Sequence, residues 1–145
     1  MELKAEHWAR CLELGGPLLQ FDAVAPFLWG DGFLEARYGV LRAYHQAVTG
    51  LGSGDGPPKP MHGNLFQIRG TYKWEFTSRL PEIQVPVLVL AGAEDLLTPL
   101  WKCLETAQGI PGARFEVIPG IGHAFPVEDP KGFAERVRRF VLLGQ

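Results

Sequence analysis

The fold is decided by the stretch Val85-Pro86-Val87-Leu88-Val89-Leu90-Ala91-Gly92, which runs directly into Ala93-Glu94-Asp95. The stretch is continuously apolar, is rich in β-branched residues and leucine, and shows no polar alternation. Such a run is typical of a strand that is buried on both faces in a parallel sheet covered by helices. It therefore predicts a strand that delivers Asp95 at its carboxyl end.

A second strand is predicted from Arg114 to Ile118, and its loop leads through Gly120 and Gly122 to His123. Between the strands, Thr98-Pro99 predicts a helix start, with the threonine as N-cap and the proline at the first helical position. That helix is expected to end near Gln108-Gly109. A strand, a helix and a second strand in this order form a right-handed crossover, the unit of a parallel α/β sheet.

A last helix is predicted to start at Asp129-Pro130, which repeats the pattern of a capping residue followed by proline. Its apolar residues recur at helical spacing and are expected to form a buried stripe. These residues are Phe133, Val137, Phe140 and Val141.

Residues 1–80 read differently, as helices broken by glycine and proline. Breaks are expected at Gly15-Gly16-Pro17 and at Gly30-Asp31-Gly32, and the Gly/Pro-rich segment 50–60 is expected to be a loop. A helical stripe covers 34–48, and another helix is predicted from about Asn64 with Leu65, Ile68, Tyr72 and Phe76 on one side. We therefore predict a helical region over 1–80, followed by strand, helix, strand and helix over 81–145. The fold class is α/β with a small parallel sheet.

Asp95 and His123 are the residues expected to carry chemistry. Ligands of an open parallel sheet bind beyond the carboxyl ends of the strands, where both residues are predicted to lie. A carboxylate beside an imidazole fixes its tautomer and stabilises the imidazolium that forms when the ring accepts a proton. Gly120 and Gly122 allow the tight backbone that brings the histidine to its neighbour. Glu94 is an alternative acid, and Glu128 is expected to brace the loop that carries His123.

The composition excludes several classes of protein. Of 145 residues, 46% are hydrophobic and 21% are charged, which is typical of a globular protein rather than a disordered one. The 14 basic and 16 acidic side chains give a net charge of −2 and are mixed along the chain. Because no basic block is present, we expect neither a nucleic-acid partner nor an anionic membrane surface.

The cysteines argue against a metal site and against secretion. Cys11 and Cys103 form no C-x-x-C pair and no metal-ligand spacing with the four histidines, so we expect no metal and no cofactor. Residues 1–8 carry charges where a signal peptide would need an apolar stretch, and no run approaches the length of a membrane span. The expected location is therefore cytoplasmic, with both thiols reduced.

The chain resembles the α/β-hydrolase superfamily in the pattern Ile83-x-Val85-Pro86-Val87-Leu88-Val89-Leu90-Ala91-Gly92-x-x-Asp95-x-x-Thr98-Pro99, followed by Pro119-Gly120-x-Gly122-His123, Glu128-x-Pro130 and Phe133. It looks most like the enol-lactonase and carboxylesterase-like members with a helical cap. The resemblance implies that Asp95 is the acid of a Ser-His-Asp triad, that His123 is its general base, and that residues 1–80 correspond to the cap. The chain would then be the C-terminal portion of that fold.

The nucleophile that the resemblance calls for is absent. Ser53 and Ser78 are the only serines, and neither stands in a Gly-x-Ser-x-Gly turn after a strand. Cys103 falls in the middle of a predicted helix, where its thiol would pack rather than attack. His62-Gly63 resembles the His-Gly of the oxyanion loop, but it follows a Pro-rich segment instead of an early strand and is expected to be a loop histidine.

Two functions remain open from the sequence. The first is a truncated or split hydrolase, inactive alone, that cleaves a small ester or lactone when an N-terminal hydrolase half supplies the serine. The second is a non-catalytic remnant or binding module that associates with itself, because a two-stranded sheet leaves strand edges open to pairing with another copy. A homo-oligomer whose strands complete the sheet is the expected assembly.

Overall fold

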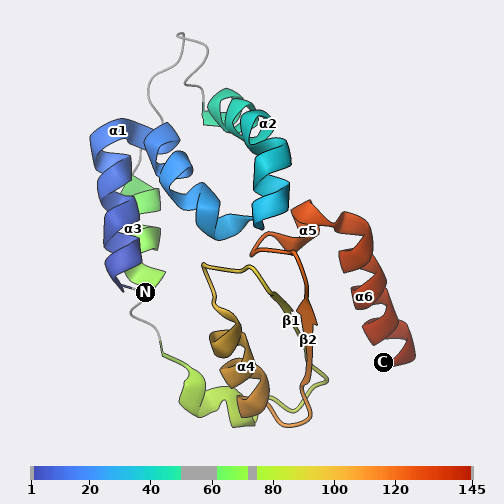
Figure 1. Ribbon diagram of the computed structural model, residues 1–145. Coiled ribbons are helices and arrows are strands. Elements are labelled where there is room, and N and C mark those ends of the chain that lie inside the picture. Colours follow the sequence, from blue (N-terminus) through green and yellow to red (C-terminus); the bar gives the residue numbers. More distant parts are fainter. Residues whose placement is uncertain (1, 50–61, 72–74, 145) are drawn as a thin grey trace. The chain divides into compact units, whose positions relative to one another are not determined.

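The computed structural model describes residues 2–49, 62–71 and 75–144. Six helices, one 3-10 helix and two strands lie in these ranges. In chain order they are α1 (Glu2–Leu28), α2 (Asp31–Thr49), α3 (His62–Thr71), η1 (Thr77–Glu82), β1 (Leu88–Gly92), α4 (Leu100–Gly109), β2 (Arg114–Ile118), α5 (Phe125–Glu128) and α6 (Pro130–Leu143) (Figure 1).

The chain divides into two compact units. The first consists of Met1–Ala25 and Arg37–Glu75, and the second of Pro26–Ala36 and Phe76–Gln145. The second unit therefore includes residues 26–36, which cover the end of α1 and the first turn of α2. The division at residue 80 that the sequence suggested stays a prediction.

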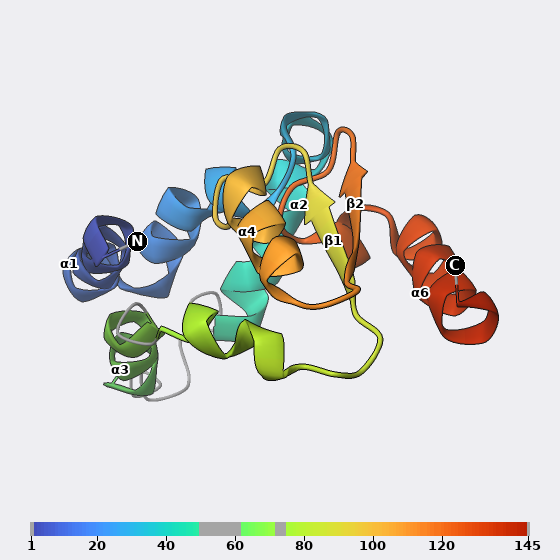
Figure 2. The same cartoon turned by 90° about the horizontal axis from the view of Figure 1, so that it is seen from below.

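The second unit is built on a parallel pair of strands. β1 pairs with β2 in a register that sets Leu88 opposite Arg114 and Gly92 opposite Ile118. Helix α4 joins the strands along the chain, and α4 and α6 flank them on opposite sides (Figures 1 and 2). The α/β class with a small parallel sheet is confirmed, and β2 has the bounds that were predicted for it.

The first unit is helical, and its longest helix bends at a predicted break. Gly16 adopts φ 71° and ψ −168° inside α1, a left-handed φ that glycine adopts without the strain that a side chain would bring. Helix resumes after this kink and continues to Leu28, just before the second predicted break at Gly30-Asp31-Gly32. Leu12 and Ala9 are completely buried here.

Two predictions about the first unit need correction or fall outside the described residues. Helix α3 ends at Thr71, so Phe76 does not extend its apolar stripe and instead precedes η1. The predicted loop over 50–60, together with Tyr72, lies outside the described residues.

The predicted cap of α4 is wrong by one residue. The N-cap is Pro99, and no side chain caps the helix. Pro99 has φ −56° and an extended ψ of 149°, so the first helical residue is Leu100. Asp95 forms a turn just before this helix, because its Oδ1 accepts hydrogen bonds from the N–H groups of Leu97 and Thr98 at 2.9 and 2.8 Å.

The start of α6 was predicted correctly, but its buried stripe was not. Asp129 caps the helix by accepting a hydrogen bond from the N–H of Gly132 at 2.9 Å, and Pro130 is its first residue. Phe133 and Phe140 are half-buried, whereas Val137 and Val141 are 37% and 70% exposed. Helical spacing shows which face is apolar, but burial also needs a surface to cover that face, and two strands provide little.

Along the described ranges, no helix combines the length and the apolar character needed to cross a membrane. The cytoplasmic location stays a prediction.

Candidate active site

The structure brings Asp95 and His123 together. Asp95 lies three residues beyond the end of β1 and His123 lies five residues beyond the end of β2. Because the strands are parallel and end in register, the two loops leave the sheet at the same edge. The Nδ1 atom of His123 lies 2.9 Å from Oδ2 of Asp95.

The two side chains differ in their access to solvent. The Asp95 side chain is 7% exposed, whereas that of His123 is 41% exposed. Although Asp95 is buried, both of its carboxylate oxygens have partners: one accepts from two backbone N–H groups and the other contacts the imidazole. An ionised carboxylate only accepts, so Nδ1 of His123 is then the donor and Nε2 carries the free lone pair. In this arrangement Nε2 of His123 has a lone pair that can accept a proton.

The backbones of the two loops are tied to each other. The N–H of Ala93 donates to the carbonyl of Ile118, and the N–H of Glu94 donates to the carbonyl of Ile121, both at 2.9 Å. Gly120 adopts φ +69°, which turns the chain toward Asp95. These contacts hold the acid and the base on one frame.

The rival acid has a different partner. Oε2 of Glu94 accepts a hydrogen bond from the N–H of Asp31 at 2.8 Å, at the start of α2. The carboxylate that contacts His123 is therefore that of Asp95 rather than that of Glu94.

Glu128 braces the histidine loop, as was expected. Its two oxygens lie 3.0 and 3.1 Å from the N–H of Gly122, the residue before His123. Oε2 also accepts from the N–H of Gly30 at 2.9 Å. The sequence did not reveal Gly30 and Asp31 as partners of these carboxylates. The available signal was the start of α2, because the first N–H groups of a helix need acceptors from elsewhere.

None of the candidate nucleophiles is hydrogen-bonded to His123 in the described part of the chain. Ser78 lies exposed in η1, and Ser53 is outside the described residues. The thiol of Cys103 donates to the carbonyl of Thr98 with an Sγ to O distance of 3.6 Å. Burial, followed by the negative charge of Asp95, raises the pKa of the Cys103 thiol, which disfavours the reactive thiolate.

Two other histidines have partners of their own. His45 stacks on Phe21 in the first unit with a ring separation of 4.4 Å, and His7 contacts Cys11 within α1. The side chain of His62 is outside the described residues. Among the groups whose placement is described, no three His, Cys, Asp or Glu residues are arranged to hold a metal ion.

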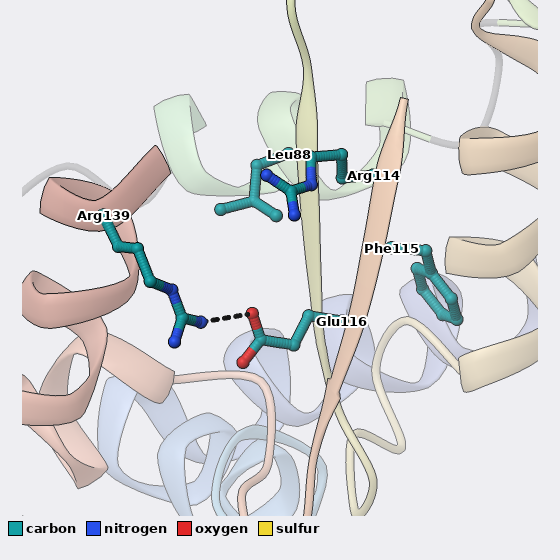
Figure 3. Close-up of a pocket in the computed structure, with 5 residues that line it drawn as sticks. All are labelled: Leu88, Arg114, Phe115, Glu116 and Arg139. Atoms are coloured by element: carbon teal, nitrogen blue, oxygen red, sulfur yellow. Dashed lines mark hydrogen bonds and ion pairs between the residues drawn. The ribbon is translucent and has the colours of Figure 1, made fainter. Parts of the chain in front are cut away.

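A hollow of about 360 Å³ lies at the other end of the strands. It is lined by Leu88, Arg114, Phe115, Glu116 and Arg139, and the first two of these begin β1 and β2. Figure 3 shows Arg139 of α6 reaching Glu116, whereas Phe115 points to the opposite side of β2. Because Asp95 and His123 follow the carboxyl ends of the same strands, this hollow is separate from the acid–base pair.

Comparison with known proteins finds relatives among hydrolases, although no protein-family model matches. The chain is 33% identical over 143 residues to a protein of Caulobacter sp. (strain K31) named "Putative carbamate hydrolase RutD", covering 93% of this chain and 51% of that relative. It is 32% identical over 109 residues to a proline iminopeptidase of Lactobacillus delbrueckii subsp. bulgaricus, covering 75% of this chain and 32% of that enzyme.

Solved structures share the fold. An α/β hydrolase named MGS-M2, from a Medee basin deep-sea metagenome, matches with a TM-score of 0.81 at 21% identity over 99% of this chain and 50% of that chain. The enol-lactonase of Burkholderia xenovorans LB400 matches with a TM-score of 0.76 at 24% identity over 94% of this chain and 49% of that chain. The chain spans about half the length of the proteins in these two structures and of the Caulobacter relative.

Proposed function

Because this chain belongs to the α/β-hydrolase superfamily and its partial coverage fits the C-terminal portion of that fold, we propose that it carries the acid and the base of a Ser-His-Asp hydrolytic site. The serine and the oxyanion hole would come from polypeptide outside these 145 residues. The observation that carries the proposal is the 2.9 Å contact between Nδ1 of His123 and Oδ2 of Asp95.

The chemistry follows from the geometry of this pair. Asp95 keeps the proton of His123 on Nδ1, so Nε2 accepts the proton of the serine hydroxyl as its oxygen attacks the substrate carbonyl. The imidazolium then gives that proton to the leaving group, and an acyl-enzyme remains. In the second half of the cycle a water molecule attacks the acyl group while His123 removes its proton; the bond to the serine oxygen then breaks, the imidazolium returns the proton to that oxygen, and the acid product leaves. Asp95 stabilises the imidazolium in both halves.

The substrate class we propose is a small ester or lactone. One relative is named a putative carbamate hydrolase and one similar structure is an enol-lactonase. Hydrolysis of a carbamate and hydrolysis of a lactone both begin with attack on a carbonyl carbon. Carbamates therefore belong in the test panel beside esters and lactones.

Complementation tests this function. The chain alone is expected to give no hydrolysis of p-nitrophenyl esters, a lactone or a carbamate. Activity is expected when it is co-expressed with the N-terminal half of the Caulobacter relative, provided that half carries a serine in a Gly-x-Ser-x-Gly turn. In the active complex, Asp95→Asn should lower kcat by about 10⁴-fold because it favours the wrong tautomer of His123. Glu105→Gln, on the exposed face of α4, is the matched control and should change little.

The outcome that contradicts this mechanism is hydrolysis by the chain alone that survives His123→Ala. Equal activity of the Asp95→Asn and wild-type complexes would contradict the role given to the acid.

A second function, self-association without catalysis, is favoured by the apolar surface of α6. Val141, Leu142 and Leu143 are 70%, 64% and 65% exposed, and β1 and β2 form a sheet of only two strands. Sheet edges and apolar faces of this kind pair readily with another copy. Sedimentation velocity should show a dimer or a larger assembly that Val141→Asp weakens. A monomer at all concentrations, with a well-protected core by hydrogen exchange, would exclude it.

A further inference from the structure

Two glutamates connect the histidine loop to a segment far away in the sequence. The carboxylate of Glu128 accepts hydrogen bonds from the N–H groups of Gly30 and Gly122, and Glu94 accepts from the N–H of Asp31. The first of these bonds joins residues 98 positions apart. We call residues 28–31 the root segment, because they lead into α2.

The root segment touches the histidine loop through its backbone as well. The N–H of Ala124, the residue after His123, donates to the carbonyl of Leu28 at 2.8 Å. A Cβ atom placed on Gly122 would lie 2.5 Å from backbone atoms of Trp29 and Gly30. The residues on both sides of His123 are therefore held against the root segment, and only glycine fits at position 122.

The imidazole itself has few restraints. Its side chain is 41% exposed, and within the described residues it makes a polar contact with Asp95. It also follows Gly120 and Gly122, and glycine loses more conformational entropy on ordering than other residues do. The direction of the ring therefore depends on how firmly the backbone of Gly122 is held.

We propose that Glu128 is a positioning residue for His123. One carboxylate bridges the amides of Gly122 and Gly30, and hydrogen bonds to an ionised acceptor are stronger than neutral ones. This bridge fixes the backbone from which His123 projects and so keeps Nδ1 in line with Asp95. Without the bridge, the buried amides of Gly30 and Gly122 lose their acceptor, and the loop must move to find another.

The role of His123 as a base rests on the proposed function, whereas the orientation of its ring does not. The test therefore measures the tautomer of the His123 ring in the chain alone, without serine or substrate. Failure of the positioning role leaves the hydrolytic proposal standing, and a blank hydrolase assay leaves the positioning role standing.

The experiment measures the imidazole tautomer by ¹⁵N NMR together with amide hydrogen exchange. In the wild-type chain, the neutral ring of His123 should be mainly the Nδ1–H tautomer. In Glu128→Ala, the Nε2–H tautomer should become a substantial fraction, and exchange at Gly122 and Gly30 should speed up at least 10-fold. Glu128→Gln keeps the size and one acceptor oxygen, so it should fall between the two and can be read even if the alanine variant fails to fold.

Glu94→Ala is the matched control, because it removes the same kind of bond from the root segment while leaving the contacts of Glu128 to the histidine loop in place. It should speed exchange at Asp31 and leave the tautomer unchanged. The proposal is overturned if folded Glu128→Ala or Glu128→Gln keeps the wild-type tautomer while exchange at Gly122 accelerates, because Glu128 would then serve stability alone. It is also overturned if Glu94→Ala shifts the tautomer as much as the Glu128 variants do.

Discussion

The two units of this chain differ in the polar contacts that stabilise each of them internally. In the first unit, side chains bind side chains: Asp22 accepts from the hydroxyl of Tyr38 at 2.8 Å and from Nε of Arg42 at 3.0 Å. The second unit has such pairs too, for example between Arg136 and Glu116, but in the loops around His123 carboxylates bind backbone amides, as Asp95 and Glu128 do. Long side chains adapt when their partner shifts, whereas a bond to an amide fixes the backbone itself. The unit that carries the acid–base pair is the one whose loops are fixed in this way.

The largest expected difference between the two units is in how a glycine substitution changes the free energy of unfolding. Gly122→Ala, in the second unit, would force its Cβ into the backbone of Trp29 and Gly30. We expect a loss of roughly 4 kcal/mol in the free energy of unfolding, measured with urea, as for other severe steric changes. Gly39→Ala, in the first unit, meets no atom within 4 Å in α2 and should instead stabilise by up to about 1 kcal/mol. Equal effects of the two substitutions would contradict the close approach at Gly122.

A buried leucine tests the apolar packing of the first unit. Leu12 is fully buried in α1, so Leu12→Ala removes apolar burial and leaves a cavity. The expected loss is about 3 kcal/mol, with faster amide exchange in α1. Leu14→Ala is the control, because Leu14 lies on the same helix and is 75% exposed. A similar loss for both variants would show that Leu12 is not in a packed core.

The smallest expected effect is a pH dependence that arises in the first unit. Burial lowers the pKa of His45 below 6.5, although the charge of Asp22 partly opposes this. For Asp22, burial raises the pKa, but hydrogen bonds from Arg42 and Tyr38 outweigh it and bring the pKa below 3.8. The unfolded chain then binds more protons in both windows, so stability falls as the pH drops below 6.5 and again below 3.8.

Urea unfolding between pH 7.5 and pH 3 measures this dependence. His45→Gln should remove the decline that begins near pH 6.5, and Asp22→Asn should remove the one below pH 3.8. An unchanged slope in either variant would assign that decline to other groups.

Local signals were enough to place the acid and the base. The positions of glycines and prolines in the second unit correctly predicted β2, the end of α4 at Gly109 and the cap of α6 at Asp129. They also placed Asp95 and His123 at the ends of adjacent strands, and the structure shows the contact between them.

The predictions that failed depended on contacts beyond the reach of a local pattern. Thr98 looked like a cap, but the extended ψ of Pro99 places the first helical residue at Leu100. Val141 looked buried because helical spacing reports the apolar face of a helix and not what covers that face. The bond from Gly30 to Glu128 spans 98 residues: the start of α2 indicates that the N–H of Gly30 needs an acceptor, but nothing nearby in the sequence indicates that Glu128 supplies it.

The register of β1 and β2 sets the positions of Asp95 and His123 along the strand direction. Gly92 lies opposite Ile118, so both loops begin at the same level along the strands. Each strand residue adds about 3.3 Å, so deleting one residue from β2 would displace His123 by about the length of its contact with Asp95. The same deletion would exchange the two faces of β2. Insertions and deletions should therefore be tolerated over evolution between α4 and β2, beyond Asp95, but not within the strands.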